Sequence, residues 1–188
     1  MLWAIPVGLV VGKLAGGSLD ALTTFRLRWA WLAVAGFLVQ AALFTRLGSE
    51  VAGDVGPPVY VLSTLGVFVA VLRNARLPGM ALVAVGALLN LAAITANGGF
   101  MPASAAALSM AGLHGAGTHT NSVVLAHPAL EALTDVYALP ASFPLANVFS
   151  VGDVLIGLGI VIVIAAAMRR PVARRLRSAS AESAEARV

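Results

Sequence analysis

Five long apolar runs divide this 188-residue chain and constrain its fold more than any other feature. They lie near residues 1–14, 29–45, 57–72, 80–96 and 148–168. A helix that crosses the hydrocarbon core of a bilayer needs about 20 apolar residues, because it rises about 1.5 Å per residue across about 30 Å. The runs therefore predict an all-α integral membrane protein with about five transmembrane helices. The first run is short, and it spans only if its helix continues past Lys13, whose side chain can reach the headgroups.

The composition excludes other classes of protein. Hydrophobic residues make up 60% of the chain and charged residues only 11%, and the mean hydropathy is +0.94. A soluble domain carries about 25% charged residues, and a disordered chain is more polar still. The chain has no cysteine, so disulfides, thiol catalysis and thiolate metal sites are excluded. We expect no cofactor.

The basic residues predict the orientation of the chain. If the loops at 13–28 and 73–79 share one side with the C-terminal segment, that side holds eleven of the twelve basic residues. The other side then holds only Arg46. Loops rich in Lys and Arg face the cytoplasm, so we expect the N-terminus outside and the C-terminus inside. The first residues lack the features of a cleaved signal peptide, and we interpret them as a retained membrane segment.

Two segments lie between and after the apolar runs. Residues 97–147 have no Lys or Arg and form a long outer loop in this topology. Residues 103–113 and 128–137 are predicted to form short helices within it, the second with Pro at its first position. Residues 169–188 are predicted to be a basic, disordered cytoplasmic tail. Its arginines can bind anionic lipid, whereas nucleic-acid binding would require aromatic or helical readers beside them.

Three polar residues lie inside apolar runs, where each must be hydrogen-bonded or functional. For Gln40 and Asn90, a hydrogen bond between helices is the simplest interpretation. Asp153 lies about one turn into the last run, three residues after Ser150. Ser150 can be the N-cap of the helix with Asp153 as a favourable partner of the helix dipole, or Asp153 can serve a function. Both interpretations of Asp153 remain open.

Two segments at the ends of the outer loop resemble those of a known family. They are residues 97–102 (Asn-Gly-Gly-Phe-Met-Pro) and 147–153 (Asn-Val-Phe-Ser-Val-Gly-Asp). Their signatures are similar to those of an uncharacterised family of small bacterial membrane proteins, a domain of unknown function. The resemblance covers most of residues 1–168. It implies about five helices in the cytoplasmic (inner) membrane of a bacterium, and it implies no activity.

A second resemblance has chemical content. Residues 86–91 (Gly-Ala-Leu-Leu-Asn-Leu) and 149–157 (Phe-Ser-Val-Gly-Asp-Val-Leu-Ile-Gly) are similar in order to the last half of lipoprotein signal peptidase. This resemblance places Asp153 on a catalytic position. However, Ala93 lies where that family has an Asp, and Met101 and Pro102 lie where its second catalytic Asp is expected. Because an aspartyl dyad needs two carboxylates that share a proton, the catalytic candidates would be Asp135 and Asp153.

The outer loop also contains the three histidines of the chain, His114, His119 and His127. Together with Glu131 and Asp135 they offer ligand types that zinc accepts. Their spacing matches no known metal motif, and glycines separate them. We therefore interpret them as surface histidines of a loop, with a metal site as the alternative.

These observations lead to three hypotheses about function. The first is binding of a lipid headgroup, a small ligand or a partner protein at an outer-face pocket, without covalent chemistry; its candidate residues are Asn97, Asp153, Asn90, Asn147 and Ser150. The second is an aspartyl peptidase. The third is a small transporter or channel subunit, although so few ionisable residues leave little to line a route. The expected partners are membrane lipid and a second copy or another membrane protein, and we expect no nucleic acid.

Overall fold

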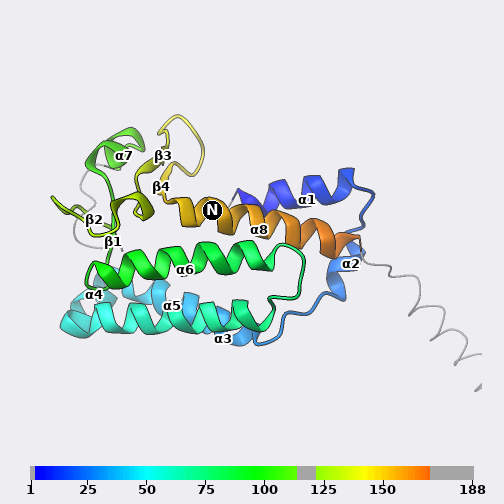
Figure 1. The fold of residues 1–188 in the computed structure, drawn as a ribbon, viewed down its shortest axis with the longest axis horizontal. Coiled ribbons are helices and arrows are strands. Elements are labelled where there is room, and N and C mark those ends of the chain that lie inside the picture. The colour runs from blue at the N-terminus through cyan, green and yellow to red at the C-terminus, as the bar shows by residue number, and fades with distance from the viewer. Residues whose placement is uncertain (1–2, 114–121, 170–188) are drawn as a thin grey trace, which may run out of the picture.

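Five apolar helices lie side by side in the described part of the chain (Figure 1). The structure is a computed structural model, and it describes residues 3–113 and 122–169. In chain order the helices are α1 (Ala4–Leu14), α3 (Ala30–Leu43), α5 (Gly56–Arg73), α6 (Met80–Ala96) and α8 (Val151–Met168). They pack in the order α1, α8, α6, α5 and α3. The helices that come first and last in the chain, α1 and α8, are therefore neighbours. Each helix corresponds to one of the five apolar runs.

Within residues 3–113 and 122–169, two helical segments are long and apolar enough to cross a membrane, judged by length and composition. One is Leu47–Arg73, in which α4 (Arg46–Ala52), the 3-10 helix η1 (Gly53–Val55) and α5 follow one another; the other is Val151–Met168. Only 11% and 22% of their apolar windows are buried. The core helix of a soluble protein would be mostly buried, whereas most side chains of these two segments are partly buried or exposed. The helices α1, α3 and α6 are apolar too, but they have only 11, 14 and 17 residues.

Glycines allow α6 and α8 to approach closely at two levels. A Cβ atom on Gly86 would overlap the carbonyl oxygen of Gly152. A Cβ atom on Gly159 would lie 2.7 Å from the carbonyl oxygen of Gly79. This order of contacts makes the two helices antiparallel. Helices in lipid commonly pack through small residues in this way, because the hydrophobic effect does not drive them together.

The helix α1 packs on the other side of α8, also through glycines. Gly8 and Gly12 are both buried. A Cβ atom on Gly8 would lie 3.0 Å from Cβ of Ile164, and one on Gly12 would lie 3.2 Å from Cα of Ala165. The contacts run in the same direction along both helices, so α1 and α8 are parallel. The starts of α1 and α8 therefore lie at the same end of the bundle (Figure 1).

The segment between α6 and α8 forms a cap at this end of the bundle (Figure 1). Strand β1 (Met101–Pro102) pairs in parallel with β2 (Ser122–Val123), and β3 (Tyr137–Leu139) pairs in antiparallel with β4 (Asn147–Phe149). Helix α7 (Ala105–Met110) follows β1 in the chain, and the 3-10 helix η2 (Glu131–Leu133) precedes β3. The cap has a small apolar core of its own, formed by Ala103, Ala107, Leu108, Ala111 and Val148.

The structure confirms one of the two helices predicted in this segment and corrects the other. Helix α7 lies inside the predicted range 103–113. The helix predicted over 128–137 is wrong, because only η2 forms there and β3 begins at Tyr137. Leu130 has a left-handed backbone conformation (φ 53°), and Asp135 pairs in parallel with Ala103. Pairing with a distant segment of the chain therefore replaces the local helix.

Gly152→Ala should destabilise the protein, because the new Cβ would overlap Oδ1 of Asn90 and lie 2.7 Å from the carbonyl oxygen of Gly86. We expect a loss of about 1–3 kcal/mol, seen as a lower melting temperature in detergent. The matched control is Gly157→Ala in the same helix, where the new Cβ would make an ordinary 3.9 Å contact with Cβ of Ala4. Equal melting temperatures for the two variants would contradict the close approach of α6 and α8.

Candidate functional site

The first turn of α8 carries a reciprocal cap. Ser150 is the N-cap residue, and its Oγ accepts a hydrogen bond from the backbone N–H of Asp153 at 3.0 Å. The Asp153 Oδ2 accepts one from the backbone N–H of Ser150 at 3.1 Å. These residue types suit the start of a helix, because they satisfy N–H groups that have no partner within the helix. The predicted capping role of Ser150 and Asp153 is confirmed.

Asn90 joins this cap from the middle of α6. Its Nδ2 donates to Oδ1 of Asp153 at 2.8 Å, and its Oδ1 accepts from Oγ of Ser150 at 2.8 Å. The predicted hydrogen bond between helices is therefore confirmed for Asn90. Gly152 makes room for it, since a Cβ there would overlap the Asn90 carboxamide. We call Asn90, Ser150 and Asp153 the polar cluster.

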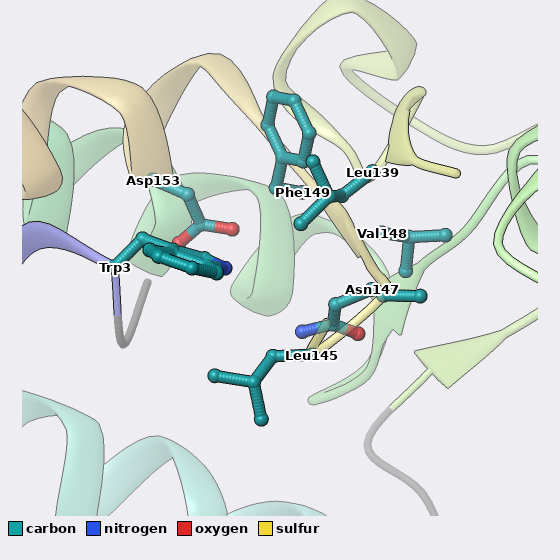
Figure 2. Close-up of a pocket in the computed structure, with 8 residues that line it drawn as sticks. Trp3, Leu139, Leu145, Asn147, Val148, Phe149 and Asp153 are labelled. Atoms are coloured by element: carbon teal, nitrogen blue, oxygen red, sulfur yellow. The ribbon is translucent and has the colours of Figure 1, made fainter. Parts of the chain in front are cut away.

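A cavity of about 450 Å³ opens beside the polar cluster (Figure 2). Its walls come from the residue before α1, the start of α8 and the hairpin of β3 and β4. They are formed by Trp3, Leu139, Leu145, Ala146, Asn147, Val148, Phe149 and Asp153. The Nε1 of Trp3 donates to the carbonyl oxygen of Pro144 at 3.1 Å, which ties the start of α1 to the hairpin loop. The volume lies in the range of small-molecule sites.

Asp153 is the one charged side chain among the described residues that line this cavity. Each of its oxygens accepts one hydrogen bond within the polar cluster. A carboxylate has about four lone-pair positions, so Asp153 can accept further hydrogen bonds from a ligand. Apart from Asn147, the other walls are apolar or aromatic. The cavity can therefore hold an amphipathic ligand whose polar end meets Asp153.

Asp135, the second candidate carboxylate, is buried in the cap with 6% of its surface exposed. Its backbone N–H donates to the carbonyl oxygen of Pro102 at 2.9 Å, and its carbonyl oxygen accepts from the N–H of Ser104 at 3.0 Å. Its Oδ1 is buried and has no hydrogen-bond partner among the described residues. Burial and, to a smaller extent, the negative charge of Asp153 raise the pKa of Asp135 to about 7. The two carboxylates therefore interact, but Asp135 is absent from the residues that line the cavity.

Asn97 holds the cap to the bundle. It follows the last turn of α6, and its Nδ2 donates to the carbonyl oxygens of Ala93 at 2.7 Å and Ala129 at 2.9 Å. Its Oδ1 accepts from the backbone N–H of Ala129 at 2.8 Å. Gly98 and Gly99 come next with φ values of 70° and 89°, which glycine adopts readily. The Asn-Gly-Gly sequence is therefore the joint between α6 and the cap.

The five residues predicted to bind a ligand have different places in the structure. Asp153 and Asn147 line the cavity, and Asn90 and Ser150 hold Asp153 in place. Asn97 does not line the cavity. Sequence reasoning missed the aromatic and aliphatic walls, above all Trp3. The available signal was a tryptophan near the start of an apolar run, because tryptophan is common where a helix meets the membrane surface.

The described residues contain no arrangement that would hold a metal ion. His127 is exposed, and His114 and His119 lie outside the described residues. No group of three or more His, Cys, Asp or Glu side chains in residues 3–113 and 122–169 could bind a metal. The structure thus offers no coordination geometry for the metal-site alternative in this part of the chain.

Asp135→Asn should change how stability depends on pH. The native pKa of Asp135 is about 7 and its ordinary value is 3.8, so the native state binds the proton more tightly than the unfolded state. Stability should therefore fall as the pH rises from about 4 to about 7 and stay low above that. The difference between the two pKa values corresponds to on the order of 4 kcal/mol, which the neutral Asn would recover.

The measurement is the melting temperature of the wild type and of Asp135→Asn at pH 5 and pH 8. The advantage of the variant should be larger at pH 8, where the buried carboxylate of the wild type is ionised. An equal difference at both pH values would mean that Asp135 keeps an ordinary pKa.

Comparisons with known proteins place the chain in a family. The search of curated proteins and the search of solved structures find no match. Residues 24–165 match the family described as a family of unknown function, DUF5317. The match covers the polar cluster and every residue that lines the cavity except Trp3. It confirms the expected resemblance to a domain of unknown function, and the chain therefore belongs to the DUF5317 family.

Proposed function

We propose that the protein is a multi-pass protein of the cytoplasmic (inner) membrane, with its N-terminus outside and its C-terminus inside. The outward-facing apolar side chains of the adjacent helices support this arrangement. The distribution of charge supports it too. The end of the bundle opposite the cap carries Lys13, Arg26, Arg28, Arg73, Arg76 and Arg169, whereas Arg46 begins α4 at the cap end. Because Lys and Arg favour the cytoplasmic side, the cap and its cavity would face outward.

Helix α1, the shortest of the five apolar helices, fits this arrangement without crossing the whole hydrocarbon core. Helix α1 has 11 residues and covers about 16 Å, compared with a core of about 30 Å. It ends at Leu14, just after Lys13. The long side chain of Lys13 can extend toward the cytoplasmic headgroups, while α8 covers one side of α1.

The function that the geometry supports best is binding, without covalent chemistry, at the outward-facing cavity. The ligand would be a lipid headgroup, another small molecule or part of a partner protein. The observation that carries this proposal is the position of Asp153, which Asn90 and Ser150 hold at the edge of an apolar cavity of about 450 Å³. A carboxylate that only capped α8 would not require an open cavity beside it.

An aspartyl peptidase related to lipoprotein signal peptidase is the second candidate. One observation favours it, namely that Asp135 is buried and interacts with the charge of Asp153. An aspartyl dyad requires two carboxylates that lie close enough to interact. Binding is preferred because Asp135 does not line the cavity that a substrate would enter.

A transporter or channel subunit is less well supported. The polar residues that would line its route belong to two separate sets of hydrogen bonds. Gln40 donates to Ser63 at 3.3 Å and to Thr64 at 3.2 Å, which connects α3 to α5 and confirms the hydrogen bond expected between helices. Asn90 instead bonds to residues of α8. The two sets therefore lie between different pairs of helices.

Reporter fusions test the topology. An alkaline phosphatase fused after Gly117 should be active, because this enzyme works only outside the cytoplasm, and one fused after Arg177 should be inactive. A green fluorescent protein at the same positions should give the opposite pattern. Phosphatase activity at Arg177 together with none at Gly117 would reverse the proposed orientation.

Filling the cavity tests the binding function. Ala146→Trp adds an indole to the cavity wall, so molecules that stay bound to the wild type in mild detergent should be lost from the variant. Native mass spectrometry measures these bound molecules. Ala141→Trp is the matched control, because Ala141 is exposed on the same loop and does not line the cavity. Equal retention by the two variants would argue against binding at this site.

A further inference from the structure

We infer that the cavity between Trp3 and Asp153 binds an alkylammonium group, that is, a positively charged amine attached to an apolar chain. This inference rests on the proposed binding function and names the class of ligand for the same cavity. A carboxylate, two aromatic rings and several aliphatic side chains meet there, and these three features match the parts of such a ligand.

The charge of the cavity favours a cation. Asp153 contributes one negative charge, and none of the lining residues is Lys or Arg. The N-terminus of α8 opposes this charge with only about half a positive charge, so the sum remains negative. An ammonium group has hydrogen-bond donors and no acceptors, which suits the free lone pairs of Asp153. A carboxylate or phosphate in the same place would be repelled.

Aromatic rings lie around Asp153. Figure 2 shows the indole of Trp3 beside the Asp153 carboxylate, with Phe149 on another side of the cavity. The Nε1 of Trp3 already bonds to Pro144, so the indole offers a ligand its ring surface and not its N–H. Phe149 is held by stacking on Tyr137, with ring centroids 5.7 Å apart. Tryptophan attracts cations to its ring face most strongly among the aromatic residues, and aromatic rings beside a carboxylate suit ammonium ligands well.

The rest of the cavity suits an apolar chain. Leu139, Leu145 and Val148 line it, and an ammonium group alone would fill only a small part of about 450 Å³. The cavity lies at the cap end of α1 and α8 (Figure 1), which in the proposed topology is near the outer membrane surface. An amine with a hydrocarbon chain can reach this position from the bilayer.

Two sources share this chemistry, namely a lipid with an amine headgroup and a soluble amine. A phospholipid also carries a phosphate, and no basic residue among those lining the cavity would pair with it. The shared feature is therefore the ammonium group, and the experiment distinguishes the two sources by competition.

The test measures binding to the full chain in dodecyl maltoside micelles. The chain has three tryptophans, so Trp29→Phe together with Trp31→Phe leaves Trp3 as the fluorescent reporter in the cavity wall. Octylammonium, octanoate and octanol are titrated in turn, with empty micelles as the reference. These probes have chains of equal length and differ in charge. We expect octylammonium to bind at least about tenfold more tightly than the other two, because it alone can donate charged hydrogen bonds to Asp153, which repels octanoate.

Variants in the cavity wall test the role of charge. Asn147→Lys should weaken the binding of octylammonium and strengthen that of octanoate, whereas Asn147→Asp should have the opposite effects. Neither change touches the cap of α8. Asp153→Asn should weaken octylammonium binding about tenfold, and the pair at position 147 decides the question even if that variant does not fold. The control is Asp54→Asn, an exposed position outside the cavity wall, and it should leave binding unchanged.

Competition then identifies the source of the amine. Displacement of octylammonium by phosphatidylethanolamine in the micelles would assign the cavity to a lipid headgroup, and displacement by free ethanolamine alone would assign it to a soluble amine. Equal binding of the three probes, or no effect of charge at position 147, would overturn the ammonium inference and leave the binding function intact. Binding of none of the three would overturn both.

Discussion

The hydrogen bonds between Asn90 and the start of α8 join α6 to α8, two of the inner helices in the packing order. They require the backbones of α6 and α8 to approach closely, which the glycines at positions 86 and 152 allow. Burying an amide or a carboxylate without partners would cost several kcal/mol, whereas here each group finds a partner in the other helix. Because apolar contacts are not directional, these hydrogen bonds set the register of α6 against α8. The register in turn places Asp153 at the edge of the cavity.

Asparagine side chains attach the loops at both ends of the bundle in the same way. Asn97, after α6, bonds to both backbone groups of Ala129 in the cap. Asn74, after α5, bonds to both backbone groups of Arg28, at 2.9 and 2.8 Å. Each side chain also donates to a carbonyl oxygen in the last turn of its own helix. One carboxamide can therefore end a helix and hold a distant loop, because it has both donors and an acceptor.

The cap forms most of the cavity wall, and it also buries a carboxylate, which is unfavourable for stability. Its backbone pairing buries Asp135, whose Oδ1 has no partner among the described residues and whose pKa rises to about 7. The same pairing places the hairpin of β3 and β4 over the start of α8, so that its side chains enclose the space beside Asp153. Ionisable groups whose pKa is shifted by burial are common near functional sites. The unfavourable carboxylate and the cavity thus belong to one region of the protein.

The mostly helical structure, the positions of the five apolar helices and the cap of α8 follow from the sequence alone. Each depends on local features, namely the length of an apolar run or the three-residue spacing of Ser150 and Asp153. The cavity, the role of Asn97 and the extended backbone at Asp135 were decided by the tertiary structure. Trp3 meets Pro144 across most of the chain, and pairing with Ala103 replaced the helix predicted over 128–137. Contacts between distant segments leave no local pattern, because their free energy depends on where the whole fold places each partner.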